Sequence, residues 1–190
     1  MKKTLILLSL TLISWGAFAQ HGHAAMQSKM ADKSAVLSPV KVERSEAVTV
    51  IITNYLALKD ALVVDNSGKA ADYGKLLFDA FKKFDISTQS KAHQKELTDI
   101  IEDAGEHAEH ISKNSGNIEH QREHFETLST DLKDLIVITG SDRNLYQVYC
   151  PMYNNREGAA WLSSSEVIKN PYLGSKMVKC GNVTQEITIQ

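Results

Sequence analysis

Four stretches of the sequence repeat apolar residues at intervals of three and four positions, and this pattern constrains the fold more than any other feature. Such spacing places the apolar side chains on one face of an α-helix. We expect helices at residues 45–63, from about 67 to 85 with Asn66 or Ser67 as its cap, at 97–111 and at 118–136. Helices joined by short polar loops bury these faces most simply as an antiparallel four-helix bundle, so the fold is expected to be mainly α.

The pattern changes after Gly140. Residues 145–149 alternate side chains that favour strands, and a turn-rich segment at 154–158 precedes a second apolar run at 160–162. The tail at 183–189 could add one more short strand. We therefore expect a single helical domain over residues 43–190, closed by a small C-terminal β-hairpin within an irregular cap at about 141–190.

The first 19 residues resemble a secretory signal peptide. Lys2 and Lys3 precede an apolar run at residues 5–15, and the small residues of Ala17-Phe18-Ala19 suit cleavage after Ala19. The run is shorter than the ~20 residues of a membrane span, and no second stretch of that length follows. The chain is thus expected to be exported to the periplasm, with no integral membrane segment after cleavage.

Residues 20–42 show little periodicity and are expected to form a flexible arm. This arm carries nitrogen and thioether donors, namely His21, His23, Met26 and Met30. It is interpreted either as an unstructured leader or as an additional metal-binding segment.

Charge and motifs narrow the class of function. The 21 basic and 23 acidic residues nearly cancel and form no Lys/Arg block, which argues against a nucleic-acid partner. The sequence contains no G-x-S-x-G elbow, H-E-x-x-H, P-loop or C-x-x-C pair. We therefore expect a binding protein and not an enzyme.

Each of the two cysteines has a methionine close by in the sequence. Cys150 precedes Met152 by two residues, and Met177 precedes Cys180 by three. Thiolate and thioether ligands select soft ions such as Cu(I), so these four residues could form one metal site. In an oxidising compartment the same cysteines could instead form a disulfide. Their spacing leaves both interpretations open.

A second group of candidate ligands is made of histidines. His107 and His110 are expected near the end of the third helix, and His120 and His124 near the start of the fourth. Spacings of three and four residues project side chains from one side of a helix, and the short loop should bring both pairs together. The four imidazoles could form a second metal site or complete the first one. They could also belong to a solvated polar rim of charge pairs.

Four segments of the sequence resemble a known family. They are residues 117–125, the run from Tyr149 to Met152, Ala160-Trp161-Leu162, and residues 170–181. They resemble a bacterial domain family of unassigned function, common in Bacteroidetes, that occurs as an exported protein. The same domain occurs fused to the periplasmic adaptor subunits of CusB-type copper and silver efflux systems. The likeness extends over residues 45–181 and is most specific in the segments around the two cysteines.

The resemblance implies a helical fold and a role in handling copper or another heavy metal in the periplasm. It points to Cys150, Met152, Met177 and Cys180, and less directly to His120 and His124. We therefore expect a soft-metal binding protein, with Cu(I) favoured, that hands its ion to an efflux or resistance system. The alternative is a disulfide-closed interaction module that docks on an efflux adaptor or another envelope protein and binds no metal.

Overall fold

The structure is a computed structural model that describes residues 35–190. The predicted signal peptide and most of the predicted arm, with His21, His23, Met26 and Met30, lie outside the described residues. None of the helices in the described part of the chain has both the length and the apolar character that a membrane span requires.

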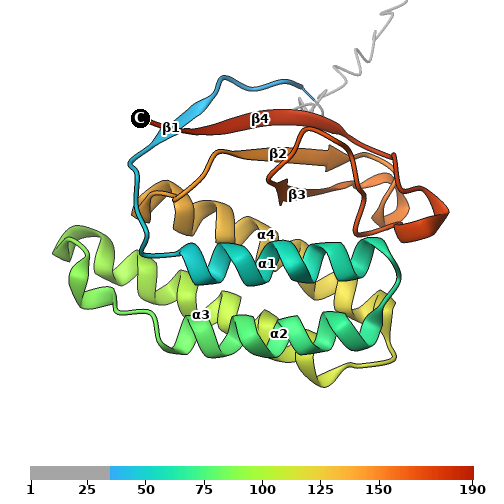
Figure 1. Ribbon diagram of the computed structural model, residues 1–190, viewed down its shortest axis with the longest axis horizontal. Helices are drawn as coiled ribbons and strands as arrows, with labels where there is room; N and C mark the ends of the chain where they lie inside the picture. Colours follow the sequence, from blue (N-terminus) through green and yellow to red (C-terminus); the bar gives the residue numbers. More distant parts are fainter. Residues whose placement is uncertain (1–34) are drawn as a thin grey trace, which may run out of the picture. The chain divides into compact units, whose positions relative to one another are not determined.

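Four helices account for about half of the described chain, as the spacing of apolar residues predicts (Figure 1). They are α1 (Thr49–Val63), α2 (Ser67–Lys82), α3 (Lys91–Lys113) and α4 (Ile118–Thr139). The side chain of Asn66 caps α2 by accepting a hydrogen bond from the Lys69 amide at 2.9 Å. The prediction that α1 begins at residue 45 is wrong, because the Ser45 amide donates to the Ser141 carbonyl at 3.0 Å and keeps this part of the chain extended.

Consecutive helices pack against one another along the bundle. Gly74 lets α2 approach α3 closely, since a Cβ at this position would lie 2.9 Å from Cγ2 of Ile111. The antiparallel order of the helices stays a prediction.

The C-terminal cap contains more regular structure than the sequence predicts. Strands β1 (Val40–Val42), β2 (Leu145–Cys150), β3 (Ala159–Ser163) and β4 (Asn182–Ile189) form a mixed sheet in the order β1-β4-β2-β3. The β2–β3 hairpin and the strand in the tail are confirmed. The arm, however, was expected to reach residue 42, and its last residues instead pair in parallel with β4.

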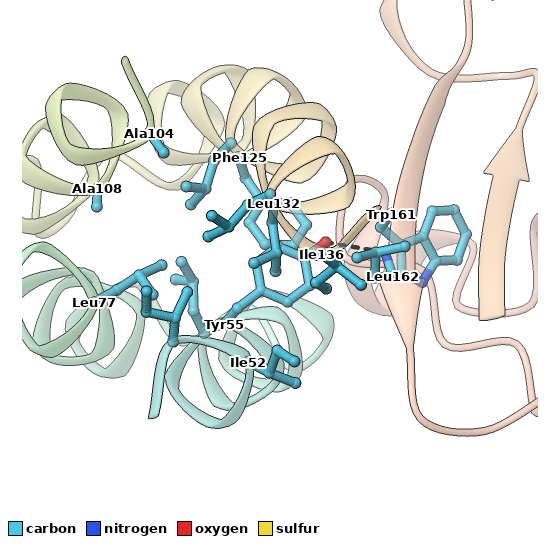
Figure 2. Packing of buried hydrophobic residues seen from close by; sticks show 14 of the residues in the cluster. Ile52, Tyr55, Leu77, Ala104, Ala108, Phe125, Leu132, Ile136, Trp161 and Leu162 are labelled. Carbon is cyan, nitrogen blue, oxygen red and sulfur yellow. Dashed lines mark hydrogen bonds between the residues drawn. The ribbon is translucent and has the colours of Figure 1, made fainter. Parts of the chain in front are cut away.

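The sheet lies over α1 and α4, and the two layers share one core (Figures 1 and 2). Tyr55 of α1 is fully buried and stacks on Phe125 of α4, with ring centroids 5.0 Å apart. Its hydroxyl is 2.8 Å from the Ser129 hydroxyl and accepts a hydrogen bond from the Leu162 amide at 3.0 Å. This one side chain therefore ties two helices to the edge strand β3.

Candidate metal centre

The four histidines predicted to lie together do so, where the end of α3 meets the start of α4, and they form a histidine cluster. His107 and His110 occupy the last two turns of α3, and His120 and His124 the first two turns of α4. Asn117 begins α4, because its side chain accepts a hydrogen bond from the His120 amide at 3.4 Å. The short connection between the helices thus places both pairs on one side of the molecule.

Arg122 fixes the start of α4 from the opposite side. Its side chain is only 2% exposed and donates to the carbonyls of Pro171 and Leu62 at 2.8 and 3.0 Å and to Asp65 at 2.5 Å. These contacts hold α4 to the cap and to the α1–α2 connection. Sequence reasoning missed this residue, because its partners are distant along the chain.

Three of the histidines have the spacing of ligands to one ion. One ring nitrogen each from His110, His120 and His124 lies within 4.8 Å of the others. The Nε2 atoms of His120 and His124 are 3.2 Å apart, and the rings of His110 and His124 stack with centroids 4.5 Å apart. Two nitrogens bound to a tetrahedral ion at about 2.0–2.1 Å would lie about 3.3 Å from each other. Small side-chain movements would therefore bring three imidazoles onto one ion.

Each of these three rings also has a partner at its other nitrogen. His120 Nδ1 is 3.0 Å from Glu123 Oε2, His124 Nδ1 is 2.8 Å from His107 Nδ1, and His110 Nε2 is 3.7 Å from Glu106 Oε1. Partners of this kind orient metal-binding imidazoles and select the tautomer that leaves a lone pair for the ion. The glutamates Glu106 and Glu123 thus lie where such outer acceptors are expected.

His124 is suited to bind an ion at neutral pH. Burial, and then the neighbouring His110, His107 and His120, lower its pKa from 6.5 to about 4. A metal competes with protons for an imidazole, so a ring that is already neutral binds without that competition.

Two aspartates that the sequence analysis did not single out lie beside the histidines. Donor atoms of Asp103 and His107 of α3 and of Asp131 of α4 lie within 4.8 Å of one another. Burial, followed by the negative charges of Asp103 and Asp134, raises the pKa of Asp131 to about 7. The sequence did contain a signal for this group. Asp103 and His107 are four residues apart on α3, and His124 and Asp131 are seven apart on α4, and both spacings place side chains on the same face of a helix.

An acidic cleft opens next to His120. It has a volume of about 450 Å³ and is lined by Glu119, Glu123, Glu126, Tyr153 and Asn154. Negative charge along such a cleft raises the local concentration of cations. Glu123 in its lining contacts His120, so the cleft adjoins the histidine cluster.

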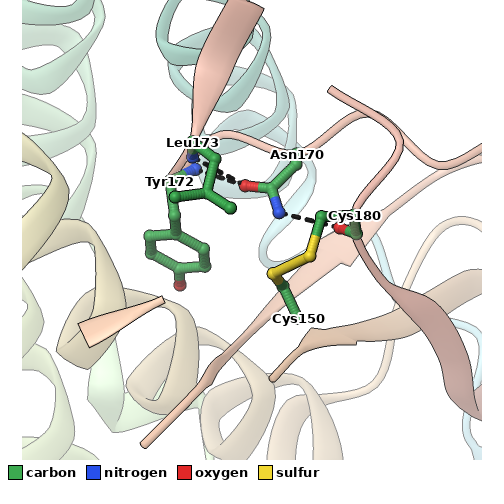
Figure 3. Close-up of a disulfide and its surroundings, with 5 residues drawn as sticks. All are labelled: Cys150, Asn170, Tyr172, Leu173 and Cys180. Atoms are coloured by element: carbon green, nitrogen blue, oxygen red, sulfur yellow. Dashed lines mark hydrogen bonds between the residues drawn. A yellow bond between two sulfur atoms is a disulfide. The ribbon is translucent and has the colours of Figure 1, made fainter. Parts of the chain in front are cut away.

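The two cysteines of the predicted cysteine and methionine site are bonded to each other. Cys150, at the end of β2, and Cys180, just before β4, form a disulfide with their Cα atoms 5.6 Å apart (Figure 3). The nearby Asn170 side chain donates to the Cys180 carbonyl at 2.7 Å. Of the two interpretations that the spacing left open, the structure has the disulfide, and in this form neither sulfur is a thiolate.

The two methionines near these cysteines are exposed. Met152 and Met177 are 46% and 45% exposed. Among the described residues, the histidine and carboxylate groups spaced for a metal ion include neither cysteine. The structure thus leaves the histidines as the better supported candidate ligands.

Comparisons with known proteins give one family. No curated protein and no solved structure matches the chain. Residues 51–144 hold nearly all of the four helices and all four clustered histidines, and they end before Cys150. This segment matches the model of a family described as a protein of unknown function (DUF3347), which confirms the expected likeness to a domain family without an assigned function.

Proposed function

We propose that this protein binds a copper ion through His110, His120 and His124 and passes it to an efflux or resistance system. The observation that carries the proposal is the convergence of three imidazole nitrogens within 4.8 Å, from two helices. Each ring is supported at its other nitrogen by Glu106, His107 or Glu123. Such support is typical of metal-binding histidines.

The donor set supports Cu(II) more than Cu(I). Soft sulfur ligands select Cu(I), whereas imidazoles suit copper, zinc, nickel and iron. Because the disulfide removes both thiolates, the expectation of Cu(I) loses its main support. Among divalent first-row ions Cu(II) binds most tightly to a given site of this kind.

Partial exposure supports transfer of the ion in place of permanent storage. The side chains of His110 and His120 are 44% and 36% exposed, so an incoming ligand can reach them. The acidic cleft beside His120 gives cations an approach route. The role in efflux follows from the resemblance to domains fused to copper and silver efflux adaptors.

The disulfide supports the expected export. Disulfides persist in oxidising compartments such as the periplasm and are rare in the cytosol. Fractionation of cells that express the full chain should recover it in the periplasm, shortened after Ala19.

Competition titration of Cu(II) against a chelator of known affinity tests the proposal. We expect His120→Ala/His124→Ala to weaken copper binding by about 100-fold or more, since removing outer partners of ligands alone costs about 10–100-fold. His93→Ala, an exposed histidine on α3, is the matched control and should bind like the wild type. Equal affinities of the double variant and the wild type would refute the site.

A docking module is the second candidate, and the disulfide-closed cap is the observation that favours it. In that case the cap would present a fixed surface to an envelope partner, with the exposed Met152, Met177 and Val178 at its surface. Freshly isolated protein without reactive thiols and without copper uptake would favour docking over metal binding.

A further inference from the structure

The histidine cluster continues into a second group of possible ligands on α3 and α4. Asp103, His107 and Asp131 each offer a donor atom within 4.8 Å of the other two. Asp131 Oδ2 is buried and has no hydrogen-bond partner among the described residues. A buried carboxylate oxygen without a donor is unfavourable, and a bound cation would relieve that cost.

The ring of His107 lies between the two groups. Its Nδ1 is 2.8 Å from His124 Nδ1, and its Nε2 is 3.5 Å from Asp103 Oδ1. One nitrogen therefore contacts His124 of the three-histidine site, and the other lies near the carboxylate of Asp103. The ring can serve as an outer partner of His124 or as a ligand next to the aspartates.

We propose that Asp103, His107 and Asp131 form a second cation site beside the three-histidine site. Two carboxylates and one imidazole suit a divalent ion that accepts both oxygen and nitrogen ligands, with Zn²⁺ as the reference case. Binding at this site needs only its own residues, whereas its use in metal transfer rests on the proposed function.

The contact between His107 and His124 makes occupation of the two sites antagonistic. Two Nδ1 atoms 2.8 Å apart share a single proton. When an ion binds Nε2 of His124, the shared proton stays on His124 Nδ1. A neutral His107 then carries its own proton on Nε2, and that proton blocks the nitrogen to which the second ion would bind. An ion on Nε2 of His107 imposes the reverse arrangement. The two sites should therefore fill in sequence, the second ion binding about tenfold or more weakly.

Zn²⁺ titration by calorimetry, with elemental analysis of the loaded protein, tests this proposal. The protein is the full chain without an affinity tag, carrying His21→Ala and His23→Ala so that the arm adds no ligands. We expect two Zn²⁺ ions per chain. The isosteric Asp131→Asn should bind one, with the affinity of the first ion unchanged within about twofold. Asp99→Asn, which removes an exposed carboxylate one turn from Asp103 on α3, is the matched control and should bind two.

A third variant separates this proposal from the proposed function. His110→Ala/His120→Ala should lose the first ion and keep the second, bound more tightly than in the wild type. One ion per wild-type chain would overturn the second site, as would an Asp131→Asn variant that weakens the first ion without changing the number bound. If His110→Ala/His120→Ala binds as the wild type does, the three-histidine site fails while the aspartate site stands.

Discussion

The cap around the disulfide and the histidine cluster of α3 and α4 carry the same kind of sequence signal, residues that can bind a metal, yet the structure uses them differently. In the cap, the sulfur atoms of both cysteines form the bond between Cys150 and Cys180 and are not thiolates. In the histidine cluster, His110, His120 and His124 each keep one ring nitrogen close to those of the other two. The comparison shows that ligand-type residues predict a metal site only when the structure leaves their donor atoms free.

Loss of the disulfide should have the largest effect on stability and none on metal binding. Cys150→Ser/Cys180→Ser opens a loop closed over a separation of 30 residues. We expect the free energy of unfolding to fall by about 3 kcal/mol, mainly because the unfolded chain regains freedom. Denaturant unfolding measures this change. A fall in copper affinity of the same variant would show that the two regions are not separate.

Copper should stabilise the fold through the histidine cluster alone. At a free Cu(II) concentration 100 times the dissociation constant, the free energy of unfolding should rise by about 2.7 kcal/mol. Thermal unfolding with and without copper measures the rise. The Cys150→Ser/Cys180→Ser variant should show the same gain in stability, and the His120→Ala/His124→Ala variant should show almost none. The opposite pattern would indicate that copper binds in the cap.

Tyr55→Phe tests whether the sheet and the histidine cluster are coupled. Removal of the hydroxyl leaves the buried Leu162 amide without its acceptor, which should cost about 2 kcal/mol. We expect this loss in denaturant unfolding, with copper affinity unchanged. A parallel loss of affinity would mean that the contact between sheet and helices shapes the metal site.

Acid should destabilise the metal-free protein through His124. Its pKa is about 4 in the folded chain against 6.5 when unaffected by its surroundings, so the unfolded chain binds more protons between these values. Stability contributed by neutral His124 is therefore present above pH 6.5 and is lost as the pH falls to 4. After allowance for solvent screening we expect about 1 kcal/mol. With a chelator present, His124→Gln should lose less stability than the wild type between pH 7.5 and 4.5; equal losses would contradict this assignment.

The methionines should matter least. Met152→Leu and Met177→Leu change exposed side chains, so unfolding should shift by less than about 0.5 kcal/mol. Copper affinity should stay within about twofold of the wild type, as measured by chelator competition. A larger drop would show that the thioethers are ligands and would contradict the contrast between the cap and the histidine cluster.

Much of the helical layer could be predicted, because periodicity records which face of each helix is buried. The same regularity predicted the meeting of His107, His110, His120 and His124. Local patterns could not reveal β1, because its partner strand β4 lies at the opposite end of the described chain. They also missed Asp103 and Asp131, whose proximity depends on how α3 and α4 rotate against each other.

The sequence by itself determined the four helices, the β2–β3 hairpin and the clustering of the histidines, since each follows from spacing within short segments of chain. Only the tertiary structure decided between a disulfide and a thiolate pair, because spacing does not say whether two Cα atoms come within 5.6 Å. It also placed the aspartates against His107. Contacts between distant segments depend on how whole helices and strands pack, and this packing is set by all the side chains of the close-packed core together.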